Sequence, residues 1–333
     1  MLQLALIGAG RMGRTHARAL GRSGETRLAA VCDPVRAAAE QAAAPAGARV
    51  FSDVNELLAD HAIDAVLIAA PTNLHDALVE RALVAGKHVL CEKPLTLDPV
   101  RDIALGRLAE DLGRVLQVGF WRRFAWPYRE AARLIAEGAI GEPRMLRAAQ
   151  WDSEPPPPAF CDPAVSGGIE IDCGVHELDL AAWLLGSQIA RVSATGTRGD
   201  PAIEAVGDVE ALAALAITSA GDPAIIDLAR SVRYGDDVRT EIVGGRGALL
   251  LSAVGSGSLV RGGDDGLVPV EVTCDDVLGD ALAVQADAFA RAIAGTRHPA
   301  LPGARESSHA LAAARAMRRA RLSGAVEPVE LHG

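Results

Sequence analysis

Two short stretches of the sequence gather residue types that can move protons or stabilise charge. In the first, HVLCEKPLT (88–96), an apolar run ends at Glu92 and Lys93, and Pro94 follows at once. Proline restricts the backbone before it, so the lysine ammonium group could be aimed at a substrate oxygen and stabilise negative charge there. The alternative is a solvated ion pair between Lys93 and Glu92, which is common for surface lysines.

The second stretch is SGGIEIDCGVHELDLAAWLLG (166–186). If residues 171–185 form one helix, Asp172, His176 and Asp179 are four and three residues apart and share a face. An imidazole titrates near working pH and can act as a general base, while carboxylates can orient a partner or bind hydroxyl groups. A surface helix with scattered charges, or a histidine with a structural role, would give a similar pattern.

A third motif indicates a nucleotide. The segment GAGRMG places Gly8, Gly10 and Gly13 between an apolar run and a helical period, which is the spacing that cradles a dinucleotide pyrophosphate at a helix N-terminus. Asp33 ends the next apolar run, where a carboxylate can bind both ribose hydroxyls of NAD and repel the 2′-phosphate of NADP. Asp33 could instead cap the following helix, and the nearby Arg36 leaves NADP open.

These motifs must be positioned by the elements around them. Up to about residue 120, segments of helical period alternate with apolar runs at 2–7, 27–32, 48–51, 64–70, 87–91 and 114–119. This alternation predicts an α/β fold, a Rossmann domain whose doubly wound parallel sheet has helices on both faces.

The carboxyl ends of those strands would bring GAGRMG, APTNLH (70–75) and CEKP to one rim, where ligands of such sheets bind. Thr72 and Asn73 on this rim could equally cap the next helix. The predicted cofactor contacts are Gly8, Gly10, Arg11, Met12, Gly13, Asp33, Thr72, Asn73, His75, Glu92 and Lys93.

After Gly119 the pattern changes to one dominated by strands. Strand-like segments run from about 190 to 273, preceded by helices at 128–137 and 171–185 and followed by helices at 281–294 and 305–322. We predict a Rossmann domain at 1–120 and a substrate-binding and oligomerisation domain at 121–333, an α+β domain with a large open, mostly antiparallel sheet. The helix at 305–322 could pack back on the first domain.

The totals exclude several classes of protein. A length of 333 residues exceeds one typical core, and the net charge of −10 argues against nucleic acid as a partner. The N-terminus lacks a basic leader and meets glycines after a short apolar run, which indicates neither a signal peptide nor a membrane span. Dispersed cysteines without a CxxC pair predict reduced thiols in a cytoplasmic protein and no metal site; they are Cys32, Cys91, Cys161, Cys173 and Cys274.

Together, GAGRMGRTH, APTNLH, CEKPLTLD, VGFWRRF and the 166–186 stretch resemble the glucose-fructose oxidoreductase, inositol dehydrogenase and rhizopine catabolism protein family, over nearly the whole chain. The resemblance implies an NAD(P)-dependent oxidoreductase that transfers a hydride between the nicotinamide and a secondary hydroxyl of a cyclitol or sugar. It implies Lys93, Asp172 and His176 as catalytic residues, Arg123 and Asp179 as substrate contacts, and a homo-oligomer, a dimer or tetramer. Inositol 2-dehydrogenases are the most similar members, through EPPPPAF, SGGIEID and YGDDVRTEIVG.

Two positions depart from that subgroup. Where its members show a second tyrosine, this chain has Tyr234, Gly235 and Asp236, and Trp121 stands where a smaller or polar residue is common. Tyr234 and Trp121 are therefore predicted substrate contacts that leave the polyol open. An NAD-dependent glycosidase and a non-catalytic sugar or dinucleotide sensor are the rival functions, although sensors tend to lose the lysine or histidine.

Overall fold

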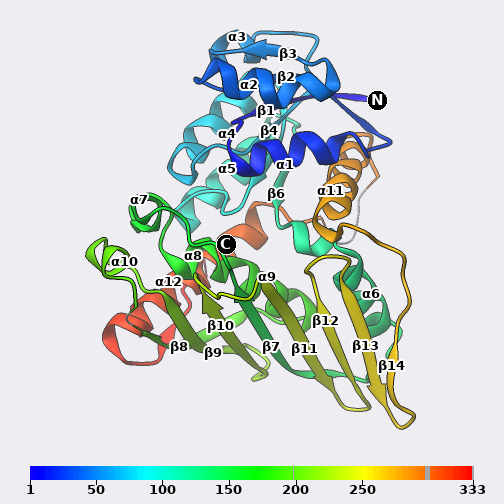
Figure 1. Cartoon of the computed structure of the whole chain (residues 1–333), viewed down its shortest axis with the longest axis vertical. Coiled ribbons are helices and arrows are strands. Elements are labelled where there is room, and N and C mark those ends of the chain that lie inside the picture. Colours follow the sequence, from blue (N-terminus) through cyan, green and yellow to red (C-terminus); the bar gives the residue numbers. More distant parts are fainter. Residues whose placement is uncertain (198, 297–300, 332–333) are drawn as a thin grey trace. The chain divides into compact units, whose positions relative to one another are not determined.

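The computed structural model describes residues 1–197, 199–296 and 301–331 and divides into two compact units (Figure 1). Met1–Phe124 and Gly279–Ser308 form the first unit. Ala125–Leu278 and the chain from His309 onward form the second.

The first unit is built on a six-stranded parallel sheet in the order β3-β2-β1-β4-β5-β6. The order reverses between β1 and β4, which creates the crevice where such sheets bind ligands. The central strand β4 is buried along its whole length, as expected when helices cover both faces of the sheet. The predicted parallel Rossmann sheet is confirmed; its strands are β1 (Leu2–Ile7), β2 (Thr26–Cys32), β3 (Arg49–Phe51), β4 (Ala65–Ile68), β5 (His88–Glu92) and β6 (Leu116–Gly119).

Local signals explain where several helices of this unit begin. Asp53 and Asp98 are N-caps whose carboxylates accept the N–H groups of Asn55 and Val100. Far along the chain, α11 (Val277–Ile293) contributes Ala286 and Phe289 to the core beneath β1 and β2. The other helices are α1 (Arg11–Leu20), α2 (Arg36–Ala43), α3 (Val54–Leu58), α4 (His75–Val84) and α5 (Pro99–Asp111), with the 3₁₀ turns η1 (Ala44–Ala46), η2 (Thr72–Leu74) and η3 (Trp121–Phe124).

The second unit contains a nine-stranded sheet in the order β14-β13-β12-β11-β7-β10-β9-β8-β15. Among the described residues of this sheet, β7 and β10 are the only strands that pair in parallel, so the predicted mostly antiparallel sheet is confirmed. Its strands are β7 (Pro143–Trp151), β8 (Ile189–Thr197), β9 (Ala211–Thr218), β10 (Pro223–Ala229), β11 (Asp237–Gly244), β12 (Ala248–Ser252), β13 (Ser258–Gly263), β14 (Gly266–Pro269) and β15 (Glu327–Pro328).

Burial alternates residue by residue along β9 and β10, which shows that one face of this sheet is covered and the other is open. Helices α6 and α9 contact the sheet. The helices of the unit are α6 (Trp126–Ala136), α7 (Pro158–Cys161), α8 (Ile169–Asp172), α9 (Gly174–Leu184), α10 (Pro201–Ala205) and most of α12 (Ala304–Ser323).

The helix predicted at 171–185 is divided in the structure. It starts earlier, at Ile169, because Gly167 and Gly168 adopt positive φ angles of 86° and 78° and turn the chain into it. It then breaks at Cys173, whose carbonyl accepts the N–H of His176 over a shorter, three-residue turn. Asp172 therefore ends α8, while His176 and Asp179 lie on α9.

Candidate functional site

The glycine turn between β1 and α1 has the shape of a phosphate cradle. Gly8 has a φ of +97°, and a Cβ there would lie 2.6 Å from the Ala69 carbonyl oxygen; at Gly13 a Cβ would lie 1.9 Å from the Gly8 carbonyl oxygen. At Gly10, by contrast, a Cβ would meet nothing within 4 Å, and no side chain of the described residues caps α1. The first and third glycines are thus required by packing, and the second faces space that a pyrophosphate can fill.

Asp33 holds this turn in place. Its Oδ2 atom accepts the N–H of Ala9 at 2.7 Å, and its Oδ1 atom accepts the N–H of Val35 at 2.8 Å. The N-cap of α2 is Val35, not Asp33. A carboxylate offers about four acceptor positions, so Asp33 retains capacity for ribose hydroxyls beside the glycine turn.

The CEKP segment leaves β5 through a buried carboxylate. Glu92 Oε1 lies 2.6 Å from His16 Nε2 on α1, and Glu92 Oε2 accepts the backbone N–H of Lys93 at 3.2 Å. Burial raises the pKa of Glu92, but the hydrogen bond from His16 and the positive charges of His16 and Lys93 outweigh it and leave the pKa below its usual value. Glu92 is therefore a buried anchor of the Lys93 backbone, and the Lys93–Pro94 bond is cis.

His75 joins the rim segments that follow β4 and β5. Its ring is buried, with Nδ1 2.8 Å from the Pro94 carbonyl oxygen and Nε2 2.8 Å from the Ala70 carbonyl oxygen. Burial lowers its pKa, which favours a neutral ring that donates one hydrogen bond. The ring therefore braces the loop that carries Lys93 against the end of β4.

Thr72 and Asn73 lie in η2, and the N-cap of α4 is Leu74, without a side-chain cap. Both line a surface pocket of about 260 Å³ together with Asp76, Thr96, Leu97 and Asp98. The segment therefore offers a hydroxyl and an amide on the rim that carries the glycine turn, where the sequence predicted cofactor contacts.

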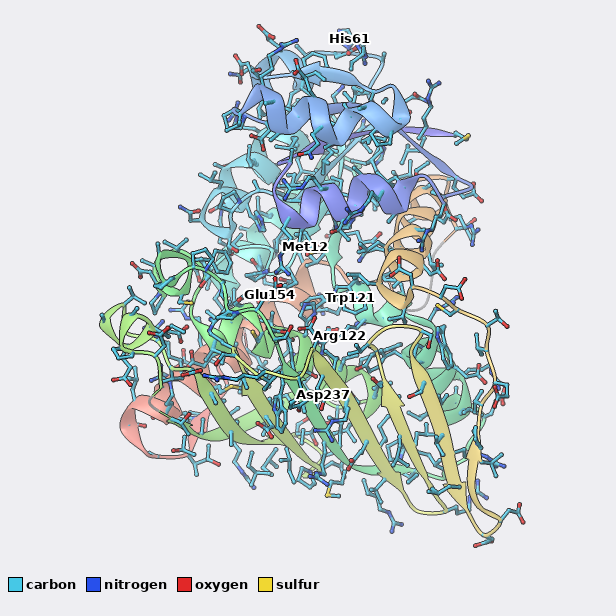
Figure 2. The ribbon with its side chains drawn as sticks, viewed as in Figure 1. Met12, His61, Trp121, Arg122, Glu154 and Asp237 are labelled. Carbon is cyan, nitrogen blue, oxygen red and sulfur yellow. The ribbon has the colours of Figure 1, made fainter. Side chains whose placement is uncertain are left out.

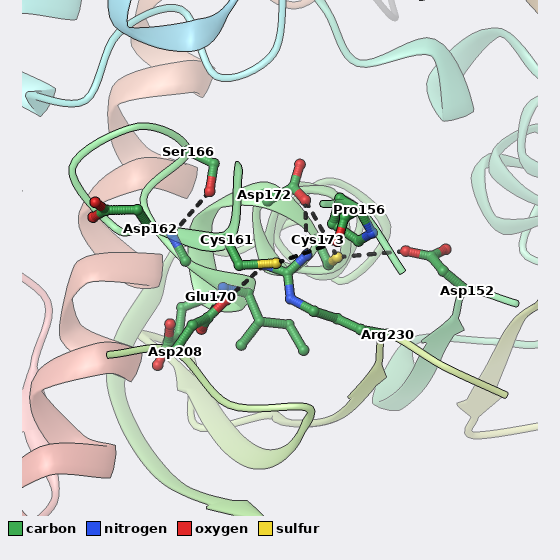
Figure 3. A network of polar contacts seen from close by, with 12 residues as sticks. Asp152, Pro156, Cys161, Asp162, Ser166, Glu170, Asp172, Cys173, Asp208 and Arg230 are labelled. Atoms are coloured by element: carbon green, nitrogen blue, oxygen red, sulfur yellow. Dashed lines mark hydrogen bonds and ion pairs between the residues drawn. The ribbon is translucent and has the colours of Figure 1, made fainter. Parts of the chain in front are cut away.

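In the second unit, Asp172 belongs to a buried polar network (Figure 3). Its Oδ2 atom accepts a hydrogen bond from Arg230 Nη1 at 3.2 Å, and Arg230 Nη2 donates to Asp208 Oδ2 at 2.9 Å. Asp208 Oδ1 in turn accepts the N–H of Ile169, the first residue of α8. The Asp172 side chain retains 21% exposure, so the ion pair with Arg230 holds it without removing it from solvent.

His176 and Asp179 are both buried, as is every residue of α9 from Gly174 to Ala181. This excludes the alternative of a surface helix with scattered charges. Val175 and Leu178 are buried on the same helix, which packs against β7 and β10. An imidazole and a carboxylate three residues apart are thus enclosed in the core-facing helix beside Asp172.

The predicted substrate contacts are placed on three different segments. Arg123 is buried in η3, and the neighbouring Arg122 guanidinium carbon lies 5.8 Å from the Trp121 ring centroid (Figure 2). Tyr234 is 67% exposed, and its hydroxyl donates to Asp237 at 3.3 Å. Asp236, at the position where the most similar relatives were expected to carry tyrosine, accepts hydrogen bonds from the Ser153 N–H and hydroxyl at 2.8 and 2.6 Å.

Sequence reasoning missed His16, Asp208 and Arg230 as parts of these assemblies. His16 could have been found from its place in GAGRMGRTH, one helical turn after Gly13. Arg230 follows β10 with no motif around it, so only its burial reveals it. In the described ranges, no three His, Cys, Asp or Glu residues are grouped to hold a metal ion, and all five cysteines are free thiols.

Comparison with known proteins decides the family. Residues 2–120 match the model described as "Oxidoreductase family, NAD-binding Rossmann fold", and residues 128–250 match "GFO/IDH/MocA C-terminal domain". The chain belongs to this oxidoreductase family. The predicted resemblance is therefore confirmed, and the first unit is an NAD-binding Rossmann domain.

Relatives within the family carry inositol dehydrogenase names. The chain is 39% identical to an inositol 2-dehydrogenase of Rhizobium meliloti over 250 residues, 74% of each chain. It is 34% identical to a myo-inositol dehydrogenase of Streptomyces leeuwenhoekii over 98% of this chain and 99% of the relative. A crystal structure of scyllo-inositol dehydrogenase from Lactobacillus casei, with bound NAD(H) and scyllo-inositol, matches with a TM-score of 0.83 and 28% identity over 99% of each chain.

None of the helices in the described parts of the chain combines the length and the apolar character that crossing a membrane requires.

Proposed function

We propose that the protein is an NAD-dependent dehydrogenase that oxidises or reduces one secondary hydroxyl of a cyclitol or sugar, as inositol 2-dehydrogenases do. The observation that carries the proposal is that Lys93 and His176 are both present and are both held by buried elements. Lys93 follows an anchored carboxylate, and His176 lies in a fully buried segment of α9. Full-length similarity to an inositol dehydrogenase supports the same conclusion.

When bound, NAD supplies the hydride acceptor, and the protein handles the proton and the charge. In the proposed mechanism His176 takes the proton of the reacting hydroxyl as general base. Lys93 donates a hydrogen bond to the same oxygen and stabilises the developing alkoxide, a contribution worth about 3 kcal/mol for one positioned donor. Asp172 orients Lys93 or the substrate, and Asp179 accepts a hydrogen bond from a neighbouring hydroxyl.

NAD is proposed as the preferred cofactor over NADP. The carboxylate of Asp33 sits beside the glycine turn, where it would repel a 2′-phosphate. Arg36, the cation that could bind a 2′-phosphate according to the sequence, pairs with Glu40 at 2.9 Å on the surface of α2. Its charge is therefore partly neutralised by a partner on its own helix.

We also propose that the chain forms a homo-oligomer through the open face of the second sheet. On that face a row of paired residues crosses β9, β10, β7, β11 and β12; it consists of Leu215, Ile225, Arg147, Glu241 and Leu250. The apolar members are 37–42% exposed, and Arg147 pairs with Glu241 at 3.0 Å in the middle. An apolar row with a central ion pair is suited to a symmetric contact with a second copy.

The test is a panel of cyclitols and monosaccharides, each offered with NAD and with NADP and followed by nicotinamide absorbance. Net NADH formation with a cyclitol or sugar is the expected result. Release of free sugar from a glycoside without net NADH would instead identify a glycosidase. Binding of NADH without turnover of any compound would overturn the enzymatic proposal and identify a sensor.

A further inference from the structure

Arg230 carries a charge that is completely removed from solvent. Its side chain has no exposed surface, and its two terminal nitrogens donate to two different carboxylates, Asp172 and Asp208. Burial lowers the pKa of Arg230, but the surrounding negative groups outweigh this and raise the pKa above its usual value. The guanidinium is therefore a permanent cation, and a buried cation requires paired anions.

Asp208 alone could meet that requirement. It is as deeply buried as Arg230, and its second oxygen accepts the N–H of Ile169 at the start of α8. The backbone N–H of Arg230 also donates to the Glu210 carbonyl oxygen at 2.9 Å. Both the backbone and the guanidinium group of Arg230 are thus held by contacts that do not involve Asp172.

The contact with Asp172 differs from the contact with Asp208. Asp172 ends α8, keeps 21% of its side chain exposed, and meets the arginine with one oxygen, Oδ2. Arg230 itself is too deeply buried to touch a substrate. It can influence the reaction only by deciding where the Asp172 carboxylate lies and what charge surrounds it.

We propose that Arg230 is a positioning residue of the reaction, which fixes the Asp172 carboxylate at the end of α8 in its working orientation. The planar guanidinium group bridges the carboxylates of Asp172 and Asp208. Rotation of the Asp172 side chain would therefore break its hydrogen bond with Arg230 Nη1. The inference rests on the proposed function, because it takes its meaning from the role of Asp172 in hydride transfer.

The charge of Arg230 also acts on its neighbours. Removing a cation raises the pKa of titratable groups nearby, and removing an anion lowers it. The charged and titratable groups labelled around the contact in Figure 3 are Asp152, Cys161, Asp162, Glu170, Asp172, Cys173 and Asp208. Asp200 acts on Cys161, Arg321 of α12 pairs with Glu170, and His176 lies on α9, which contacts α8. A pH profile therefore reports on the charge, whereas kcat at the optimum reports on the geometry.

The experiment compares Arg230→Gln, Arg230→Lys and Asp208→Asn with the wild type, using a substrate that the panel identifies. The readouts are kcat, KM, the pH dependence of kcat/KM, the affinity for NADH and the melting temperature. NADH affinity should not change, because the glycine turn lies in the other unit.

In Arg230→Gln, we expect kcat to fall about 100-fold, the loss typical of a catalytic group displaced by about 1 Å. The acidic limb of its kcat/KM profile should move to higher pH by about one unit, because losing a cation raises the pKa of the neighbouring titratable groups. Arg230→Lys keeps the charge but not the fork, so its kcat should fall less and its acidic limb should stay in place. Asp208→Asn removes the ion pair behind Arg230 but leaves the Arg230–Asp172 pair, and its amide oxygen can still accept the N–H of Ile169. Its kcat should therefore fall less than that of Arg230→Gln, while the acidic limb moves to lower pH because an anion is lost.

A purely structural arginine would give lower melting temperatures with wild-type kcat and pH profile in the folded fraction, and this result would overturn the inference. If Arg230→Gln does not fold, the other two variants still test the inference. Arg230→Lys should lower kcat without moving the acidic limb, whereas Asp208→Asn should move the acidic limb. Absence of wild-type turnover would overturn the proposed function and this inference together. If the wild type turns over substrate and the variants have the same kcat and pH profile, the inference is overturned but the proposed function stands.

Discussion

Asp102 on α5 links the stability of the first unit to pH. Its carboxyl group has no exposed surface, and Oδ1 lies 2.6 Å from the Thr96 hydroxyl on the loop that follows Lys93. Burial raises its pKa from 3.8 to about 7. The Thr96 hydroxyl also lies 2.9 Å from the Asp98 carbonyl oxygen, so a protonated Asp102 can donate to Thr96 while Thr96 donates to Asp98.

The free energy of unfolding depends on pH because the folded and unfolded states bind the Asp102 proton with different affinity. Between pH 4 and pH 7 the folded unit retains the Asp102 proton and the unfolded chain does not, so the free energy of unfolding falls as pH rises. At about 1.4 kcal/mol per pH unit, the total loss is about 4 kcal/mol and is complete above pH 7. An asparagine at this position is neutral at every pH, like the protonated carboxyl group. Asp102→Asn should therefore not lose stability between pH 4 and pH 7 through this group.

Hydrogen exchange of the α5 amides, read by mass spectrometry, measures the opening free energy of this region. The stability of Asp102→Asn relative to wild type should increase by about 3 kcal/mol from pH 5 to pH 8. Asp111→Asn, an exposed change at the end of the same helix, controls for net charge. A difference between Asp102→Asn and wild type that is the same at both pH values would refute the argument.

Three further predictions concern the cofactor, the chemistry and the assembly. Lys93→Met should lower turnover by about 100-fold or more with NADH affinity unchanged, because one charge-stabilising donor is lost; single-turnover absorbance measures it, and wild-type turnover would remove Lys93 from the mechanism. Asp33→Ala should lower the NAD/NADP ratio of kcat/KM by about tenfold, since the ratio cancels any general loosening of the turn; an unaltered ratio would leave Asp33 only the task of holding Ala9. Ile225→Lys should reduce the oligomer mass in light scattering, whereas Val84→Lys on α4 should not; equal masses for both would exclude the open sheet face as the interface.

The sequence predicted features with local signatures. The strands of the first sheet are continuous apolar runs, and Gly8, Gly10 and Gly13 have the spacing that a pyrophosphate turn demands, so both were found. The break at Cys173 was missed because the helical period continues through it. The partners of Arg230 were missed because they lie 58 and 22 residues away, and no short window contains such a pair.

The membership of α11 in the first core has a consequence for how the chain is made. Ala286 and Phe289 pack with Leu4, Leu6 and Leu28, residues that leave the ribosome long before them. The Rossmann core therefore cannot close during synthesis until most of the second sheet has emerged. A fragment ending at Phe124 would expose the apolar surface that α11 covers, and it should aggregate where the whole chain folds.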